Sequence, residues 1–135
     1  MLIRTTGGAW EPQPFLMDTM ATLTHVPLDF ADRADIPYST ARPLQTATIM
    51  GKKPRGGCLS PLTFALADLP QWAFETPACF SPDKSPGGFP LLSGSDVLER
   101  FDISLVGRPH PGYPHGYLML QLRDDHDGTT RAPAE

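Results

Sequence analysis

Two short runs near the C-terminus carry the clearest structural signal, FDISLVG at residues 101–107 and YLMLQLR at residues 117–123. Successive side chains of a β-strand point to opposite faces, so alternate residues share a face. In both runs every second residue is large and apolar, as at Phe101, Ile103, Leu105, Leu118, Leu120 and Leu122. This alternation predicts two strands that pair as a C-terminal hairpin.

The connection between the two runs reads RPHPGYPHG at residues 108–116. It is longer than the two-residue turn of a tight hairpin, and its prolines fix the backbone φ angle. We expect a semi-rigid loop that projects from the hairpin and presents Tyr113 as contact surface.

Weaker strand signals lie upstream, in runs that mix apolar and β-branched residues and end at glycine or proline. They cover residues 1–5, 20–26 and 44–50. Residues 28–43 carry several aspartates and prolines, which indicates a loop with at most one helical turn. Residues 7–15 are expected to be extended, because a residue that precedes proline avoids the helical region.

Residues 60–69 predict the clearest helix. Ser60 is a residue type that caps helix starts, and Pro61 has the φ angle favoured at the first helical position. Apolar residues then recur at helical spacing, at Leu62, Ala65, Leu66 and Leu69. A second, shorter helical turn is expected at residues 96–100.

The composition limits the length of every element. The chain has 135 residues, of which 16 are proline and 12 are glycine, so helices and strands must be short. We expect an α+β, β-leaning fold: a small antiparallel sheet with the C-terminal hairpin, one or two short helices and long Pro/Gly-rich loops. Residues 1–123 are expected to form a single globular domain with an extended N-terminal segment, and residues 124–135 a polar C-terminal tail.

The charge and hydropathy exclude some classes of partner. The formal net charge is -4 and the isoelectric point is near 5.5, which argues against a nucleic-acid binder. The one basic cluster, GKKPRGG at residues 51–57, does not have the spacing of a phosphate-binding loop and predicts a solvated turn. Neither a secretory signal nor a membrane span is present in the sequence, so we expect a soluble protein, cytoplasmic or within a soluble assembly.

The chain has two cysteines, Cys58 and Cys79. They lack the CxxC spacing of a zinc or redox site, and free, mostly buried thiols are the expectation. Cys58 precedes the helix expected at residues 60–69, a position that would lower a thiol pKa and favour a nucleophile. A small buried residue is the better interpretation, because nothing in the sequence supplies the base.

Ligand-type side chains gather around the hairpin. His110 and His115 flank its loop, and imidazole ligands suit a divalent metal such as zinc, iron or manganese. His25 could join them from another strand. His126 and the aspartates around it lie beyond residues 117–123, a strand of roughly 20 Å at about 3.3 Å per residue, so they belong at the other end of the hairpin.

Three classes of function remain open. The leading hypothesis is a non-enzymatic structural or accessory subunit of a larger assembly, of the virion or multiprotein-complex type, that binds other proteins or its own copies through extended arms and Pro-rich loops. Its contact residues would be Trp10, Phe15, Phe89 and Tyr113. The alternatives are a small metal-dependent enzyme or metal-binding module using His110 and His115, and a small acidic inhibitor protein. The leading hypothesis requires no cofactor.

Overall fold

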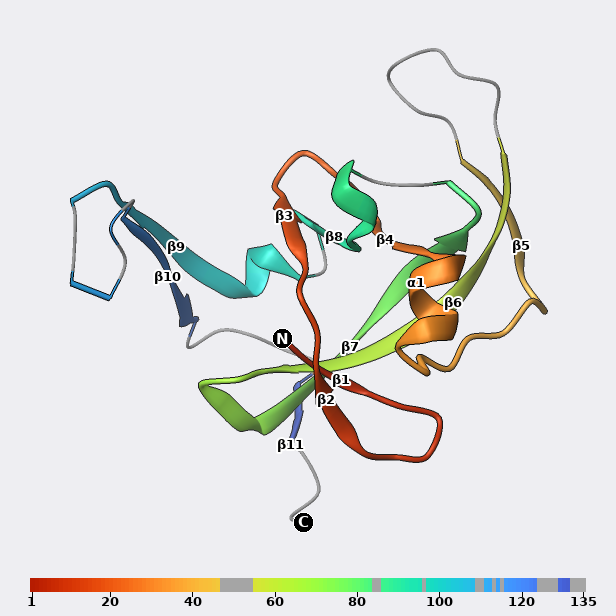
Figure 1. Cartoon of the computed structure of the whole chain (residues 1–135), viewed down its shortest axis with the longest axis horizontal. Coiled ribbons are helices and arrows are strands. Elements are labelled where there is room, and N and C mark those ends of the chain that lie inside the picture. The colour runs from red at the N-terminus through yellow and green to blue at the C-terminus, as the bar shows by residue number, and fades with distance from the viewer. Residues whose placement is uncertain are drawn as a thin grey trace.

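The computed structural model describes residues 1–46, 55–83, 86–95, 97–108, 111–112, 114, 116–123 and 129–131. Strands dominate it, which confirms the β-leaning expectation (Figure 1). The elements are β1 (Leu2–Arg4), β2 (Trp10–Pro12), β3 (Leu16–Asp18), β4 (Thr24–Pro27), α1 (Leu28–Arg33), β5 (Pro43–Thr46), β6 (Arg55–Leu66), β7 (Leu69–Ser81), η1 (Pro86–Gly88), β8 (Leu91–Ser93), η2 (Leu98–Arg100), β9 (Phe101–Val106), β10 (Tyr117–Leu122) and β11 (Thr129–Arg131), where η denotes a 3-10 turn.

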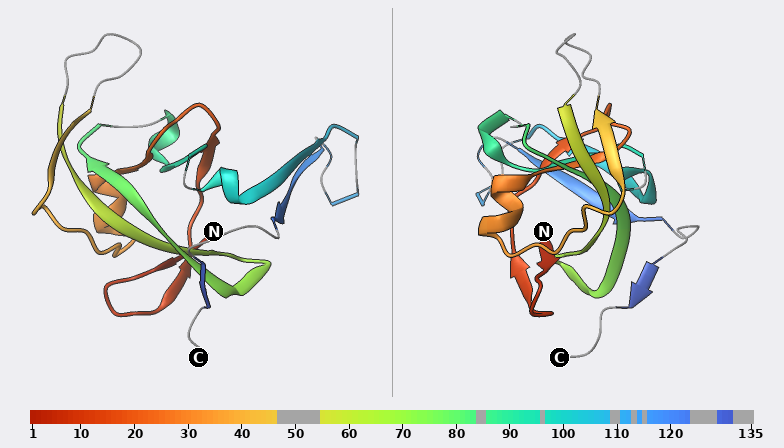
Figure 2. Two further views of the ribbon diagram at one scale, coloured as in Figure 1. Left: turned by 180° about the vertical axis from the view of Figure 1, so that it is seen from behind. Right: turned by 90° about the vertical axis from the view of Figure 1, so that its right-hand side faces the viewer.

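An antiparallel ribbon of the two longest strands, β6 and β7, forms the centre of the fold. The register runs from Cys58 opposite Phe80 to Leu66 opposite Leu69. Each strand of the ribbon takes two further partners on its outer edge: β1 and β5 pair with β6, and β4 and β11 pair with β7. The ribbon therefore organises a nine-stranded sheet, which Figures 1 and 2 show as a curved body with α1 on one side of it.

Two prolines stand opposite each other in the ribbon, Pro61 in β6 and Pro77 in β7. Proline cannot donate a ladder hydrogen bond, and it is rarely found inside a strand with partners on both sides. Pro61 falls between the residues of β6 that pair with β5 and those that pair with β1. Pro77 falls in the corresponding gap on β7, between the β11 and β4 pairings. The prolines therefore lie where the outer edges of the ribbon change partner.

The sheet is mixed, and the expectation of a small antiparallel sheet is too simple. Its path runs β2-β1-β6-β7-β4-β8-β3, with β5 and β11 attached to the ribbon. The pairs β4–β7 and β3–β8 are parallel. Parallel neighbours need a long connection, and β4 reaches β7 through α1, β5 and β6.

A single cluster of buried apolar side chains lies on the inner face of the ribbon and reaches α1, β8 and η2. Its largest fully buried members are Phe64, Phe74 and Phe80. Phe64 and Phe74 stack face to face with ring centroids 5.4 Å apart. Tyr38 stacks on Phe80 at 5.1 Å. The aromatic side chains thus fasten the two strands of the ribbon to each other and to the loop after α1.

The helix predicted at residues 60–69 is wrong, because this segment is the C-terminal half of β6 and the turn into β7. In β6 the residues Cys58, Ser60, Leu62 and Phe64 alternate as buried positions. Leu62 and Leu66 satisfy this period of two as well as the helical spacing. Pairing with β7 decides between them.

Residues near both ends of the chain pair with other strands of the sheet. Within residues 7–15, β2 pairs antiparallel with β1. Residues 129–131 pair as β11 with β7, and the other residues of 124–135 lie outside the described part of the chain. The short helical segments expected in 28–43 and 96–100 correspond to α1 and η2. None of the described helices is long and apolar enough to cross a membrane.

The stacked rings at the centre of the ribbon give a test of the fold. Replacing Phe74 by Ala should lower the free energy of unfolding by about 3–5 kcal/mol, because it removes a fully buried ring. Its neighbour Glu75 points to solvent, so Glu75→Ala should change stability by less than about 0.5 kcal/mol. Urea unfolding measures both, and equal losses would contradict the placement of Phe74 in the core.

Candidate functional site

The strands β9 and β10 form a separate two-stranded sheet, antiparallel from Tyr117 opposite Val106 to Leu122 opposite Phe101. Figures 1 and 2 show it extending from the body on the side opposite β5. The strands β9 and β10 lie in the two runs of alternating apolar residues, 101–107 and 117–123. Phe101 is buried at the base of this hairpin, and Leu120 and Leu122 pack against the core cluster. The base of the hairpin is therefore anchored, while its outer half projects.

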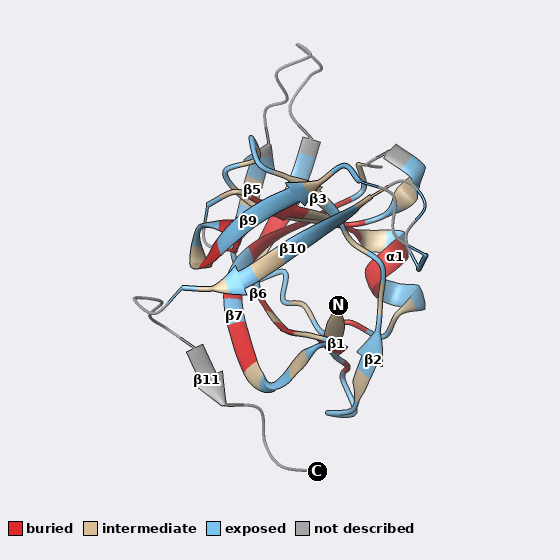
Figure 3. Ribbon diagram, turned by 90° about the vertical axis from the view of Figure 1, so that its left-hand side faces the viewer, coloured by how far each residue is buried: buried red, intermediate tan, exposed pale blue. Residues whose placement is uncertain are grey.

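The outer half of the hairpin exposes large apolar side chains. Five of the eight exposed large hydrophobic residues in the described part of the chain lie here. They are Ile103, Leu105, Tyr117, Leu118 and Met119, and we call them the hairpin surface. Leu105 is the most open, at 83% exposure. Figure 3 shows β9 and β10 as mainly exposed across this side of the molecule.

The hairpin surface has two faces. Strand alternation places Ile103, Leu105 and Leu118 on the face that carries Phe101 and the core-packed leucines. Tyr117 and Met119 lie on the opposite face. Contiguous exposed apolar surface of this kind marks interaction sites in folded proteins, whereas single exposed residues do not.

The predicted contact residues have different positions. Phe15 is half-buried and packs edge-to-face on Phe30 at 6.3 Å, so it anchors the segment before β3 to the core. Trp10 is half-buried in β2. Phe89 follows η1 and is partly exposed. Tyr113 and the candidate metal ligands His110 and His115 lie outside the described residues.

The structure brings together one polar pair that the sequence analysis did not join. His25 in β4 and Ser81 at the end of β7 lie 2.8 Å apart, from imidazole Nε2 to hydroxyl Oγ. The parallel register of β4 and β7, with His25 opposite Cys79, brings the two side chains to one face of the sheet. The Asp83 backbone N–H also donates to Ser81 Oγ, at 3.2 Å. Only the long-range β4–β7 pairing reveals this contact.

The distance between His25 and Ser81 would suit a serine nucleophile and its general base. The access of a substrate to the serine does not suit this role. Ser81 is completely buried, so its oxygen cannot meet a substrate. Burial lowers the pKa of His25, and the nearby Asp83 carboxylate works in the opposite direction. The pair is therefore a partly buried hydrogen bond that holds β4 against β7, with a histidine whose charged form is disfavoured by burial.

The cysteines are free and buried, as expected. In the ribbon Cys58 stands opposite Phe80 and Cys79 opposite Leu59, so the two side chains lie on opposite faces of the sheet. Burial raises the pKa of Cys58, and it raises that of Cys79 to about 11. The alternative of a reactive Cys58 thiolate at a helix start is wrong, because Cys58 lies within β6. Burial also disfavours ionisation of its thiol.

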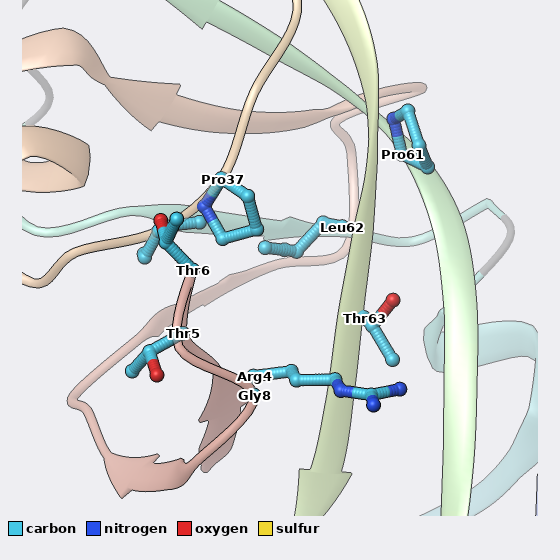
Figure 4. A pocket seen from close by; sticks show the side chains of 9 residues that line it. Arg4, Thr5, Thr6, Gly8, Pro37, Pro61, Leu62 and Thr63 are labelled. Atoms are coloured by element: carbon cyan, nitrogen blue, oxygen red, sulfur yellow. The ribbon is translucent and has the colours of Figure 1, made fainter.

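A shallow depression of about 210 Å³ lies between β1, β6 and the loop after α1 (Figure 4). Its lining includes Arg4, Thr5, Thr6, Pro37 and Leu62. The hydroxyls of Thr5 and Thr6 already donate to backbone carbonyls, at 3.3 and 3.2 Å. The depression is smaller than the roughly 300–1,000 Å³ of typical ligand sites, and its polar groups are largely committed to the fold.

No group of three or more His, Cys, Asp or Glu side chains among the described residues could hold a metal ion. The metal site predicted at His110 and His115 stays a prediction. Comparison with protein-family models, curated proteins and solved structures finds no significant match. The hairpin surface is therefore the candidate functional site that the geometry itself supplies.

The partly buried histidine gives a pH test. A folded-state pKa of His25 below the ordinary value of about 6.5 means that the unfolded chain binds the proton more readily. Its contribution to stability is complete above that ordinary value and is lost as the pH falls to the folded-state pKa. The His25→Gln variant should lack this part of the decrease in the free energy of unfolding. Urea unfolding at several pH values between 7.5 and 5 measures the difference.

The control for this experiment is Ser81→Ala. It removes the hydrogen bond and should lower stability at every pH, by about 0.5–1.5 kcal/mol, while the pH dependence from His25 remains. Parallel pH profiles for the unmodified chain and His25→Gln would contradict the assignment.

Proposed function

We propose that this chain is a non-enzymatic structural or accessory subunit of a larger protein assembly, and that it binds a neighbouring protein through the hairpin surface. The observation that carries the proposal is the concentration of exposed apolar side chains on β9 and β10. Burial of such side chains is the main favourable term in most protein association, at about 25 cal/mol per Å² of apolar surface.

The form of the hairpin supports this use. Its base is fixed by Phe101, whose ring lies 5.6 Å from that of Phe74 in the core. Its outer half is held by strand pairing between β9 and β10. A preformed, projecting element loses little conformational entropy when it docks, which favours binding.

The other classes of function gain no support from a specific contact. The metal-dependent enzyme or metal-binding module rests on His110 and His115, which lie outside the described residues. The acidic inhibitor rests on the net charge of -4 alone. Both stay hypotheses beside the proposed one.

The chain offers a matched pair of variants to test the proposal. Leu105 in β9 and Met20 after β3 are almost equally exposed, at 83% and 81%. Only Leu105 belongs to the hairpin surface. Leu105→Asp should weaken complex formation by at least about tenfold, because it places a charge in an apolar contact, whereas Met20→Asp should leave it unchanged.

The measurement is affinity capture by the tagged full chain in an extract of its native source, followed by binding titration with each purified partner. Partners that bind the unmodified chain and Met20→Asp, and are lost with Leu105→Asp, would support the proposal. Equal binding of all three chains, or no specific partner for any of them, would contradict it.

A further inference from the structure

The outer edge of β10 is an unpaired strand edge within the hairpin surface. Among the described strands, β10 pairs only with β9. A strand edge presents a row of backbone N–H and C=O groups, which is a template for another strand. The side chains along the edge and the direction of its backbone groups determine which strand can pair with it.

The register fixes which backbone groups of β10 point outward. The Arg123 N–H donates to the Arg100 carbonyl at 3.0 Å, just beyond the Phe101–Leu122 pair. In an antiparallel ladder, hydrogen-bonded pairs alternate with pairs whose backbone groups point away from each other. Leu122 therefore directs its N–H and C=O away from β9, and by the same alternation so do Leu120 and Leu118.

The side chains of β10 leave this edge unprotected. Its sequence, YLMLQL, contains no charged residue, no proline and no glycine. Natural proteins usually blunt a free edge with a charge, a proline or a bulge. The neighbouring β9 has such a charge, the exposed Asp102, and β10 pairs with it in an unbroken register. The β10 edge is therefore the part of the hairpin most open to strand addition.

We propose that β10 pairs antiparallel with β10 of a second copy of this chain and joins the two hairpins into one four-stranded sheet. The inference rests on the proposed function, because it names the partner of the hairpin surface. The two-fold axis would pass beside Leu120, which would then face its own equivalent. Leu118 would stand opposite Leu122 of the second copy. All three outward-pointing residues would find partners, with about six backbone hydrogen bonds across the interface.

The absence of charge along β10 permits a second copy as the occupant, and the leucines of the strand are self-complementary about Leu120. The chain carries a net charge of -4, so most approaches of two copies meet like charge. Along β10 there is no charge to repel an identical strand, and there is also none that would select a charged partner. Self-pairing joins the leucine rows of the two copies into one apolar face, which would cover Leu118, now 38% exposed.

The proposed register gives a charge-exchange test. Met119 of one copy would stand opposite Gln121 of the other, and both side chains are exposed on the face away from the core. We would make two double variants of the full chain, Met119→Lys with Gln121→Lys, and Met119→Glu with Gln121→Glu. Like charges directly opposite destabilise an antiparallel pair, and opposite charges stabilise it. Circular dichroism and urea unfolding would show that each variant folds.

Sedimentation velocity and light scattering should give a dimer for the unmodified chain, monomers for each double variant alone, and a mixed dimer when the two variants are combined. A second comparison uses Leu118→Pro and Ile103→Pro, two residues that are equally exposed, at 38%, and whose N–H groups point outward on opposite edges. Only Leu118→Pro should abolish the dimer, because only it removes a donor from the β10 edge.

An unmodified chain that is monomeric up to about 100 μM would overturn the inference. A dimer that persists in both double variants would also overturn it, since β10 would then lie outside the interface. If the chain is monomeric but Leu105→Asp still abolishes capture of a different protein, the proposed function stands and the second copy is the wrong occupant.

Discussion

The pairing of β6 with β7 is the interaction on which the rest of the structure depends. The two strands share one register from Cys58–Phe80 to Leu66–Leu69, and four other strands attach to their outer edges. Stacking of Phe64 on Phe74 ties the ribbon to the core. The ribbon closes through the turn at residues 67–68, whereas its outer edges are completed by strands distant in sequence, such as β1 and β4.

The same constraint explains why the hairpin is free to interact. The edges of the ribbon are occupied by β1, β5, β4 and β11, and the hairpin packs on the core through Phe101 and the leucines near its base. Its outer half has no layer of the protein against it to bury Leu105. The exposed apolar surface is therefore a consequence of the topology, and it carries both the proposed function and the proposed self-pairing.

Local patterns predicted β9 and β10 but failed for β6, although the two strands of each pair are neighbours along the chain. Alternation in residues 101–107 and 117–123 indicated β9 and β10, but the expectation that every strand is short is wrong for β6 and β7, which have 12 and 13 residues. In residues 60–69 the spacing of Leu62 and Leu66 fits helix and strand equally, and only β7 decides. The His25–Ser81 contact depends on a parallel strand pairing that no local pattern in the sequence reveals. The exposure of Leu105 depends on the position of the hairpin relative to the body, which local patterns do not reveal either.

The most direct test of the account is a nuclear Overhauser spectrum of the folded chain, read for contacts of residues 58–66. The ribbon predicts backbone proton contacts between cross-strand partners, such as Leu62 with Thr76 and Phe64 with Phe74. A helix over residues 60–69 would instead give contacts between residues three apart, such as Leu62 with Ala65. Finding the helical pattern without the cross-strand contacts would contradict the central ribbon and, with it, the placement of the hairpin.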